Sequence, residues 1–172
     1  MRSVISLLAC TVVSACSIAD FDLDEPIPEQ TVPGTPIPGP LASLFPIPIN
    51  LDLESQIQQH ETGPIDGVTL SALSLTITAT DRPSGDTDDW SFVDSIDVFV
   101  ESTKSGTTLP KVKIASVSSP GAVQTMTFDV DGGVNLKPYI EEGSQVDSSG
   151  TGTAPNDDVS YDGDSTFTVH PL

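Results

Sequence analysis

Two groups of aspartates are the part of this sequence best suited to metal chemistry. The first lies within residues 81–89 and the second within residues 156–164. Calcium takes about six to eight oxygen ligands, and aspartate-rich loops at the end of a β-sandwich can supply them. The candidate ligands are Asp86, Asp88, Asp89, Asp157, Asp158, Asp162 and Asp164, with Asn156 beside them. Neither group has the spacing of an EF-hand loop. We therefore interpret both as solvated loop tips in which aspartates form local turns, and keep calcium binding as the alternative.

The two histidines, His60 and His170, are the groups most suited to acid–base catalysis. A histidine activates a nucleophile only when the two side chains lie within hydrogen-bond reach, and no Gly-x-Ser-x-Gly motif accompanies either histidine. Zinc would need a third protein ligand, and the mature chain has no spare cysteine to provide one. We expect no enzyme activity, and interpret both histidines as partly exposed residues at strand ends. The single tryptophan, Trp90, leads into an expected strand and is interpreted as a core residue, not as a platform for a sugar.

Cys16 is the residue most suited to covalent modification. Arg2 is followed by an apolar run over residues 4–13, then by the small residues Ser14 and Ala15. A run of about ten apolar residues is too short to span a bilayer, and small residues before a cleavage point are typical of a secretory signal peptide. A thiol at that point can accept a diacylglyceryl group. After cleavage, Cys16 is the one cysteine left, so no disulfide can support the fold.

The sequence Val13-Ser14-Ala15-Cys16 resembles the lipobox of bacterial lipoprotein precursors. The resemblance covers residues 1–16. It implies a signal peptide over residues 1–15, a covalent diacylglycerol and N-acyl lipid on Cys16, and tethering of the mature chain to a membrane of the cell envelope. Ser17 stands where aspartate would favour retention in the inner membrane, so the outer membrane is favoured.

Two alternatives to acylation of Cys16 stay open. Cys10 also follows apolar residues, but acylation there would leave almost no apolar run before the cleavage point. Ordinary secretion would cleave after Ala15 or Ala19 and leave no lipid.

The net charge limits the classes of partner. The chain has 25 acidic and 6 basic residues, a formal charge of −19, and its lysines are scattered. Such a field repels phosphate backbones, so we expect no nucleic-acid binding. No apolar run after the signal peptide approaches membrane-spanning length, so the lipid would be the only membrane anchor.

Residues 17–48 differ in composition from the rest of the chain. After an acidic start, eight of the 15 prolines lie within residues 26–48. Proline fixes φ and lacks an N–H, which favours polyproline II structure over a helix or a sheet interior. We predict a linker over residues 16–48 that reaches at most about 100 Å, with a partner-docking segment as the alternative. Apolar residues near its end are interpreted as packing on the following domain: Leu41, Leu44, Phe45, Ile47 and Ile49.

From residue 49 onward, apolar residues recur with a period of two, which indicates β-strands. We expect strands within residues 68–79, 96–101, 111–114, 125–130, 146–153 and 167–169, and a strand or short helix within residues 49–60. A change of phase after Leu70 predicts a bulge near Ser71 and Ala72. Asn135 and Gly143 suit the two ends of a short helix over residues 136–142. The polar segment 146–153 is typical of an edge strand.

About seven short strands with one short helix predict an all-β fold, an antiparallel two-sheet sandwich over residues 49–172. In size it resembles immunoglobulin-like domains, although their Cys…Trp…Cys hallmark is absent, and its helix between late strands is similar to that of plant late-embryogenesis sandwich domains. A domain of this size buries about two thirds of its unfolded surface, enough to fold without disulfides.

The function that we expect from these features is a membrane-tethered, non-catalytic module for binding, adhesion or structure. Its partner would be an envelope protein or a glycan whose identity the sequence leaves open. A calcium-dependent binding module using the aspartate loops is the alternative, and a hydrolase is the third class.

Overall fold

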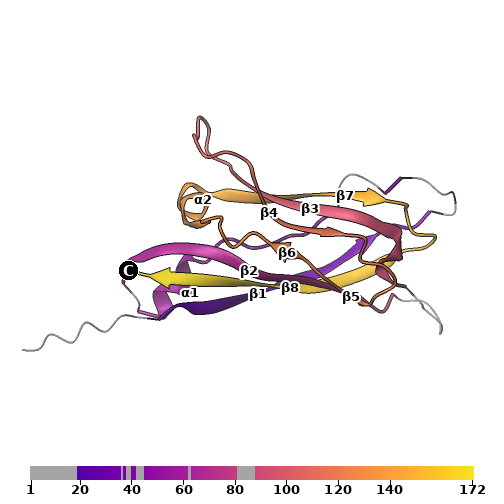
Figure 1. Ribbon diagram of the computed structural model, residues 1–172, viewed down its shortest axis with the longest axis horizontal. Helices are drawn as coiled ribbons and strands as arrows, with labels where there is room; N and C mark the ends of the chain where they lie inside the picture. Colours follow the sequence, from indigo (N-terminus) through magenta and orange to yellow (C-terminus); the bar gives the residue numbers. More distant parts are fainter. Residues whose placement is uncertain (1–18, 36, 38–39, 42–44, 62, 81–87) are drawn as a thin grey trace, which may run out of the picture.

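Two four-stranded antiparallel sheets pack face to face (Figure 1). This is a computed structural model, and it describes residues 19–35, 37, 40–41, 45–61, 63–80 and 88–172. The first sheet has the order β1-β8-β2-β5 and the second the order β6-β4-β3-β7. The strands of the first sheet are β1 (Phe21–Val32), β8 (Val159–Pro171), β2 (Ile65–Thr78) and β5 (Thr125–Thr127). Those of the second are β6 (Asp129–Val130), β4 (Val112–Ser118), β3 (Val93–Ser102) and β7 (Ser144–Gly152). The all-β sandwich predicted from the sequence is confirmed.

Alternating side chains of both sheets form the core. In β8, every second residue from Val159 to Val169 is buried, and most residues between them are more exposed. The pattern is that of a strand with one face on the core and the other towards solvent. Trp90, in the short 3-10 helix η1 (Trp90–Phe92), is fully buried and donates to the Gln124 carbonyl at 3.1 Å. The prediction that it is a core residue is confirmed.

Strand β1 corrects the prediction that residues 16–48 are a linker. Over Phe21–Val32 the chain pairs antiparallel with β8, and Leu23 and Ile27 are buried in the core. A proline-rich segment can pair here because β1 lies at the edge of its sheet, where a missing N–H breaks no second ladder. The register shifts between Ile27 and Gln30, on either side of Pro28. Proline thus restricts this segment to a sheet edge and does not exclude it from the sheet.

Residues 45–53, named here the strap, close one side of the sandwich. The chain is extended but is not a strand, and its alternate side chains enter the core: Phe45, Ile47, Ile49, Leu51 and Leu53 are all buried. The strap is fastened to three strands, by the Ser148 hydroxyl to the Phe45 carbonyl, the Tyr161 hydroxyl to the Pro46 carbonyl, and the Asn50 amide to the Glu25 carboxylate.

The structure of residues 49–60 decides between the strand and the short helix that the sequence predicted there. The short helix is confirmed as α1 (Glu54–Gln59), and the residues before it belong to the strap and not to a strand. Packing of the segment ahead of residue 49 on the domain is confirmed for Leu41, Phe45 and Ile47, and Leu44 lies outside the described residues.

On the opposite side of the sandwich, the chain itself crosses from one sheet to the other. The strand expected over residues 125–130 is divided at Phe128, whose N–H donates to the Leu73 carbonyl at 3.0 Å. Residues before it form β5 in the first sheet, and residues after it form β6 in the second.

Three local predictions are confirmed. The register of β2 shifts between Leu70 and Ala72, where the change of phase predicted a bulge. Helix α2 (Lys137–Glu142) ends at Gly143, which has φ +82°. The Asn135 carboxamide accepts from the N–H groups of Lys137 and Val68, so it ties the start of the helix to β2. Strand β7 lies at a sheet edge as expected.

The pairing also defines the two ends of the molecule. Phe21, at the start of β1, pairs with Val169 near the end of β8, so the N-terminal side of the sandwich and the C-terminus lie together (Figure 1). Thr78 pairs with Ser160, so the chain after β2 and the chain before β8 lie at the other end. Among the described residues, no helix is long and apolar enough to cross a membrane.

Candidate binding groove at the β7 edge

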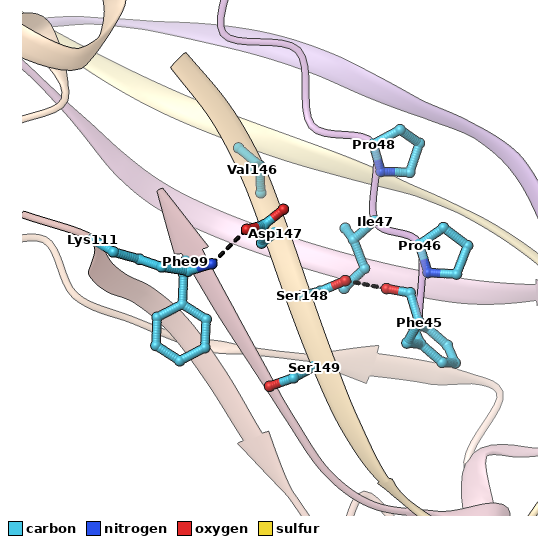
Figure 2. A pocket seen from close by; sticks show the side chains of 10 residues that line it. All are labelled: Phe45, Pro46, Ile47, Pro48, Phe99, Lys111, Val146, Asp147, Ser148 and Ser149. Carbon is cyan, nitrogen blue, oxygen red and sulfur yellow. Dashed lines mark hydrogen bonds and ion pairs between the residues drawn. The ribbon is translucent and has the colours of Figure 1, made fainter. Parts of the chain in front are cut away.

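A groove of about 680 Å³ lies where β7 meets the strap (Figure 2). Its lining comes from the strap, from β7, from β3 and from the residue before β4: Phe45, Pro46, Ile47, Pro48, Val146, Asp147, Ser148, Ser149, Phe99 and Lys111. Most of these side chains are apolar or small, and the two charged ones lie together on one side. Apolar concave surfaces with a few placed polar groups are the usual form of binding sites in proteins.

The charged side of the groove is an ion-pair cluster on the outer face of the second sheet. Figure 2 shows Asp147 directed towards Lys111, whose ammonium bonds to that carboxylate and lies 3.5 Å from Glu101. The same ammonium lies 5.6 Å from the centre of the Phe99 ring. The hydrogen bond from Lys111 lowers the pKa of Asp147, and it raises the pKa of Lys111. Both groups are therefore charged at neutral pH, and the cluster has two carboxylates for one ammonium.

The other side of the groove is the strap, which a buried aromatic cluster holds in place. The Phe45 ring stacks on Tyr161 with 5.0 Å between centroids and lies 5.9 Å from Trp90. The Tyr161 hydroxyl donates to the Pro46 carbonyl, and burial raises the pKa of Tyr161 well above its ordinary value. Ordered rings beneath the strap give this side of the groove a fixed shape.

The aspartates predicted as calcium ligands are only partly brought together. Asp86 lies outside the described residues, as does Cys16 with the rest of the lipobox. Asp89 caps η1 by accepting from the Ser91 N–H at 2.9 Å, and hydrogen bonds from Ser91 lower the pKa of Asp89. Asp158 accepts from the Gly34 N–H at 2.8 Å. The Asp89 contact is the local turn contact that the loop-tip interpretation predicts, whereas Asp158 binds a segment 124 residues away in the sequence.

Asp162 and Asp164 correct the grouping. The sequence placed them in a loop, but both belong to β8, where they pair with Thr76 and Ser74 and are exposed. The sequence missed the first half of β8 because Gly163 and Ser165 occupy inward positions where an apolar residue would have shown the period. Within the described residues, no three His, Cys, Asp or Glu side chains are grouped as a metal site would require.

His170 takes part in a hydrogen-bond chain that its sequence position did not indicate. Its Nδ1 lies 2.9 Å from Asp20 and its Nε2 lies 3.2 Å from the Thr69 hydroxyl. Acid, imidazole and hydroxyl in this order are the groups of a catalytic triad. The neighbouring N–H of Val68, however, donates to Asn135 and is not free for an oxyanion.

Two further pairs show what this chain of contacts does. The Thr168 hydroxyl donates to Asp22 at 2.7 Å and the Thr166 hydroxyl donates to Asp24 at 2.8 Å. With Asp20 and His170, they form a row of acid–donor pairs that joins β1 to β8. One sequence pattern could have revealed this pairing. Acids alternate at residues 20, 22 and 24, and hydrogen-bond donors alternate at residues 166, 168 and 170. His60 instead stacks on Phe21 at 4.2 Å.

Comparisons with known proteins add little to this description. No family model matches the chain, and no curated protein matches it. Among solved structures, a chain of Desmodium yellow mottle tymovirus is similar at 14% sequence identity and a TM-score of 0.30, with 100% of this chain and 91% of that chain covered.

Proposed function

We propose that this chain is a lipid-anchored envelope protein whose β-sandwich is a non-catalytic module that binds a partner. The observation that carries the binding role is the groove at the β7 edge, because it joins a fixed apolar side to a small charged cluster. Support for the anchor comes from Val13-Ser14-Ala15-Cys16. Many cell-surface domains, immunoglobulin-like ones included, share the two-sheet architecture.

The position of β1 changes how the anchor would hold the module. With β1 starting at Phe21, residues 17–20 alone would separate the sandwich from an acylated Cys16. Four extended residues span at most about 14 Å. The sandwich would therefore lie close to the bilayer, with the end that carries the C-terminus nearest to it. The groove lies along the side of the sandwich and would face laterally, where a neighbouring envelope protein or a glycan could reach it.

The anchor is tested by labelling growing cells with radioactive palmitate and separating membranes from soluble proteins. We expect the unchanged chain and Cys10→Ser to be labelled and to sediment with membranes. Cys16→Ser should lose the label and leave the membrane fraction. Label retained by Cys16→Ser but lost by Cys10→Ser would show that the anchor has been assigned to the wrong cysteine.

A further inference from the structure

We propose that β7 is the docking edge of this protein, where a partner adds an extended strand to the second sheet. The inference rests on the proposed binding function and gives it a mode and a class of partner. The partner segment is a peptide of alternating apolar and basic residues.

The first argument is that β7, alone among the long edge strands of the described residues, contains none of the residues that block an edge. Natural sheets block their edges with prolines, lysines, bulges or very short strands, because an open edge invites another strand to pair. Edge strand β1 has Pro26, Pro28 and a register shift, and the edge strands β5 and β6 have three and two residues. Strand β7 has nine residues and contains no proline, lysine or arginine, and the register shift in its pairing with β3 lies at its last two residues, opposite Val93 and Ser95.

The second argument concerns the backbone groups of that edge. In an edge strand, every second residue directs its N–H and C=O away from the sheet. Among the described residues, no backbone hydrogen bond joins Ser144–Ser149 to any segment other than β3, whereas Gly152 is already bonded to the Leu41 N–H. The strap runs beside this stretch, but its described residues form no ladder with β7, and it is joined to β7 by the hydrogen bond that the Ser148 hydroxyl donates to the Phe45 carbonyl.

The third argument is the chemistry on each side of the edge. An added strand would direct alternate side chains to the two sides of the groove. One set would meet Ile47, Pro48 and Val146, which suits apolar side chains. The other set would meet Asp147 and its neighbours, where two carboxylates face one ammonium. On a chain with a net charge of −19, that side favours lysine or arginine in the partner.

The test selects linear peptides of about twelve residues from a displayed random library against the full chain extracted in mild detergent. We expect enrichment of sequences that alternate apolar and basic residues. One enriched peptide is then made in two forms, with N-methyl groups on the odd or on the even residues. Strand addition predicts that one form binds and the other does not, because only alternate N–H groups face β7.

Two charge-reversal variants locate the binding site. Asp147→Lys should lower the affinity for the enriched peptide by about tenfold. Asp129→Lys makes the same charge change on the opposite edge of the same sheet and should leave that affinity unchanged. The fluorescence of Trp90 checks that both variants are folded.

The remaining outcomes would overturn the proposal. Equal binding of both N-methylated forms, or equal binding to both variants, would refute strand addition at β7 while leaving a binding function in place. Dimerisation of the chain that Asp147→Lys abolishes would make a second copy the occupant. Failure of every peptide to enrich would refute the peptide class. Palmitate labelling tests the proposed anchor separately, so a failure of the anchor is distinguished from a failure of strand addition.

Discussion

Replacing Ile27 by alanine tests whether β1 belongs to the folded domain. The chain contains the triplet Pro-Ile-Pro three times, centred on Ile27, Ile37 and Ile47. Their surroundings differ, because Ile27 in β1 is 2% exposed and Ile47 in the strap is 3% exposed, whereas Ile37 is 76% exposed. The same substitution in the same local sequence therefore probes two buried sites, one in a strand and one in the strap, and one exposed site.

The expected magnitudes follow from burial. Removing three carbons from a buried isoleucine costs about 2–5 kcal/mol, and an edge strand that can relax favours about 2–3 kcal/mol for Ile27→Ala. The cost of Ile47→Ala, where the side chain points from the strap into the core, should fall in the same range. Ile37→Ala should change the free energy of unfolding by less than about 0.5 kcal/mol. A loss of 2.7 kcal/mol corresponds to about a hundredfold change in the unfolding constant.

Urea unfolding followed by the fluorescence of Trp90 measures all three variants, because the single tryptophan is fully buried. The transition midpoint should fall for Ile27→Ala and Ile47→Ala without a change in slope. Equal midpoints for Ile27→Ala and Ile37→Ala would refute the assignment of residues 21–32 to the sheet and restore the linker interpretation.

Three other substitutions, with Gly132→Ala as a control, test the packing and the charges. Tyr161→Phe should cost about 1–2 kcal/mol, since the Pro46 carbonyl loses its donor. Because the folded pKa of Tyr161 is raised, the tyrosine's contribution is complete below its ordinary pKa of about 10 and is lost as the pH rises, so urea midpoints of the two proteins should converge above that pH. Hydrogen bonds lower the pKa of Glu142, so its contribution is lost as the pH falls below the usual carboxyl range, and Glu142→Gln should show a shallower acid loss of stability. Gly163→Ala should cost about 1–3 kcal/mol or prevent folding, because a Cβ there would lie 2.3 Å from a backbone carbonyl oxygen, whereas Gly132→Ala meets no atom within 4 Å and should be neutral. A plot of stability against pH for Tyr161→Phe or Glu142→Gln that runs parallel to that of the unchanged chain would contradict the contacts described. Equal stability of Gly163→Ala and Gly132→Ala would also contradict them.

The three Pro-Ile-Pro triplets also show where prediction from the sequence ends. Period-two patterning was enough for β2, β3 and β4, since each has one face on the core, and β7 was predicted from its polar composition as an edge strand. Proline content restricts a segment to edges and extended structure but does not say whether the segment is paired. That depends on a partner strand more than 100 residues away in sequence.

The candidate site could not be read from the sequence for a similar reason. Phe99, Lys111 and Asp147 come together through the pairing of β3 with β4 and β7, and Phe45 joins them where the strap lies beside β7. Acidic clusters were visible in the sequence, yet Asp162 and Asp164 lie on a strand, and a list of acids does not show which backbone positions they occupy. Groove residues of ordinary types carry no local pattern that would single them out.

The most direct test of the account is protease treatment of the lipidated chain reconstituted in vesicles, under native conditions. The account predicts that the sandwich stays with the vesicles, since only residues 17–20 separate Cys16 from β1, and a cut between β1 and the strap would leave β1 paired with β8. Intact-mass measurement of the supernatant identifies any fragment that is released. A soluble, resistant fragment that begins between residues 33 and 49 would show that residues 16–48 are a cleavable linker, and would contradict the account.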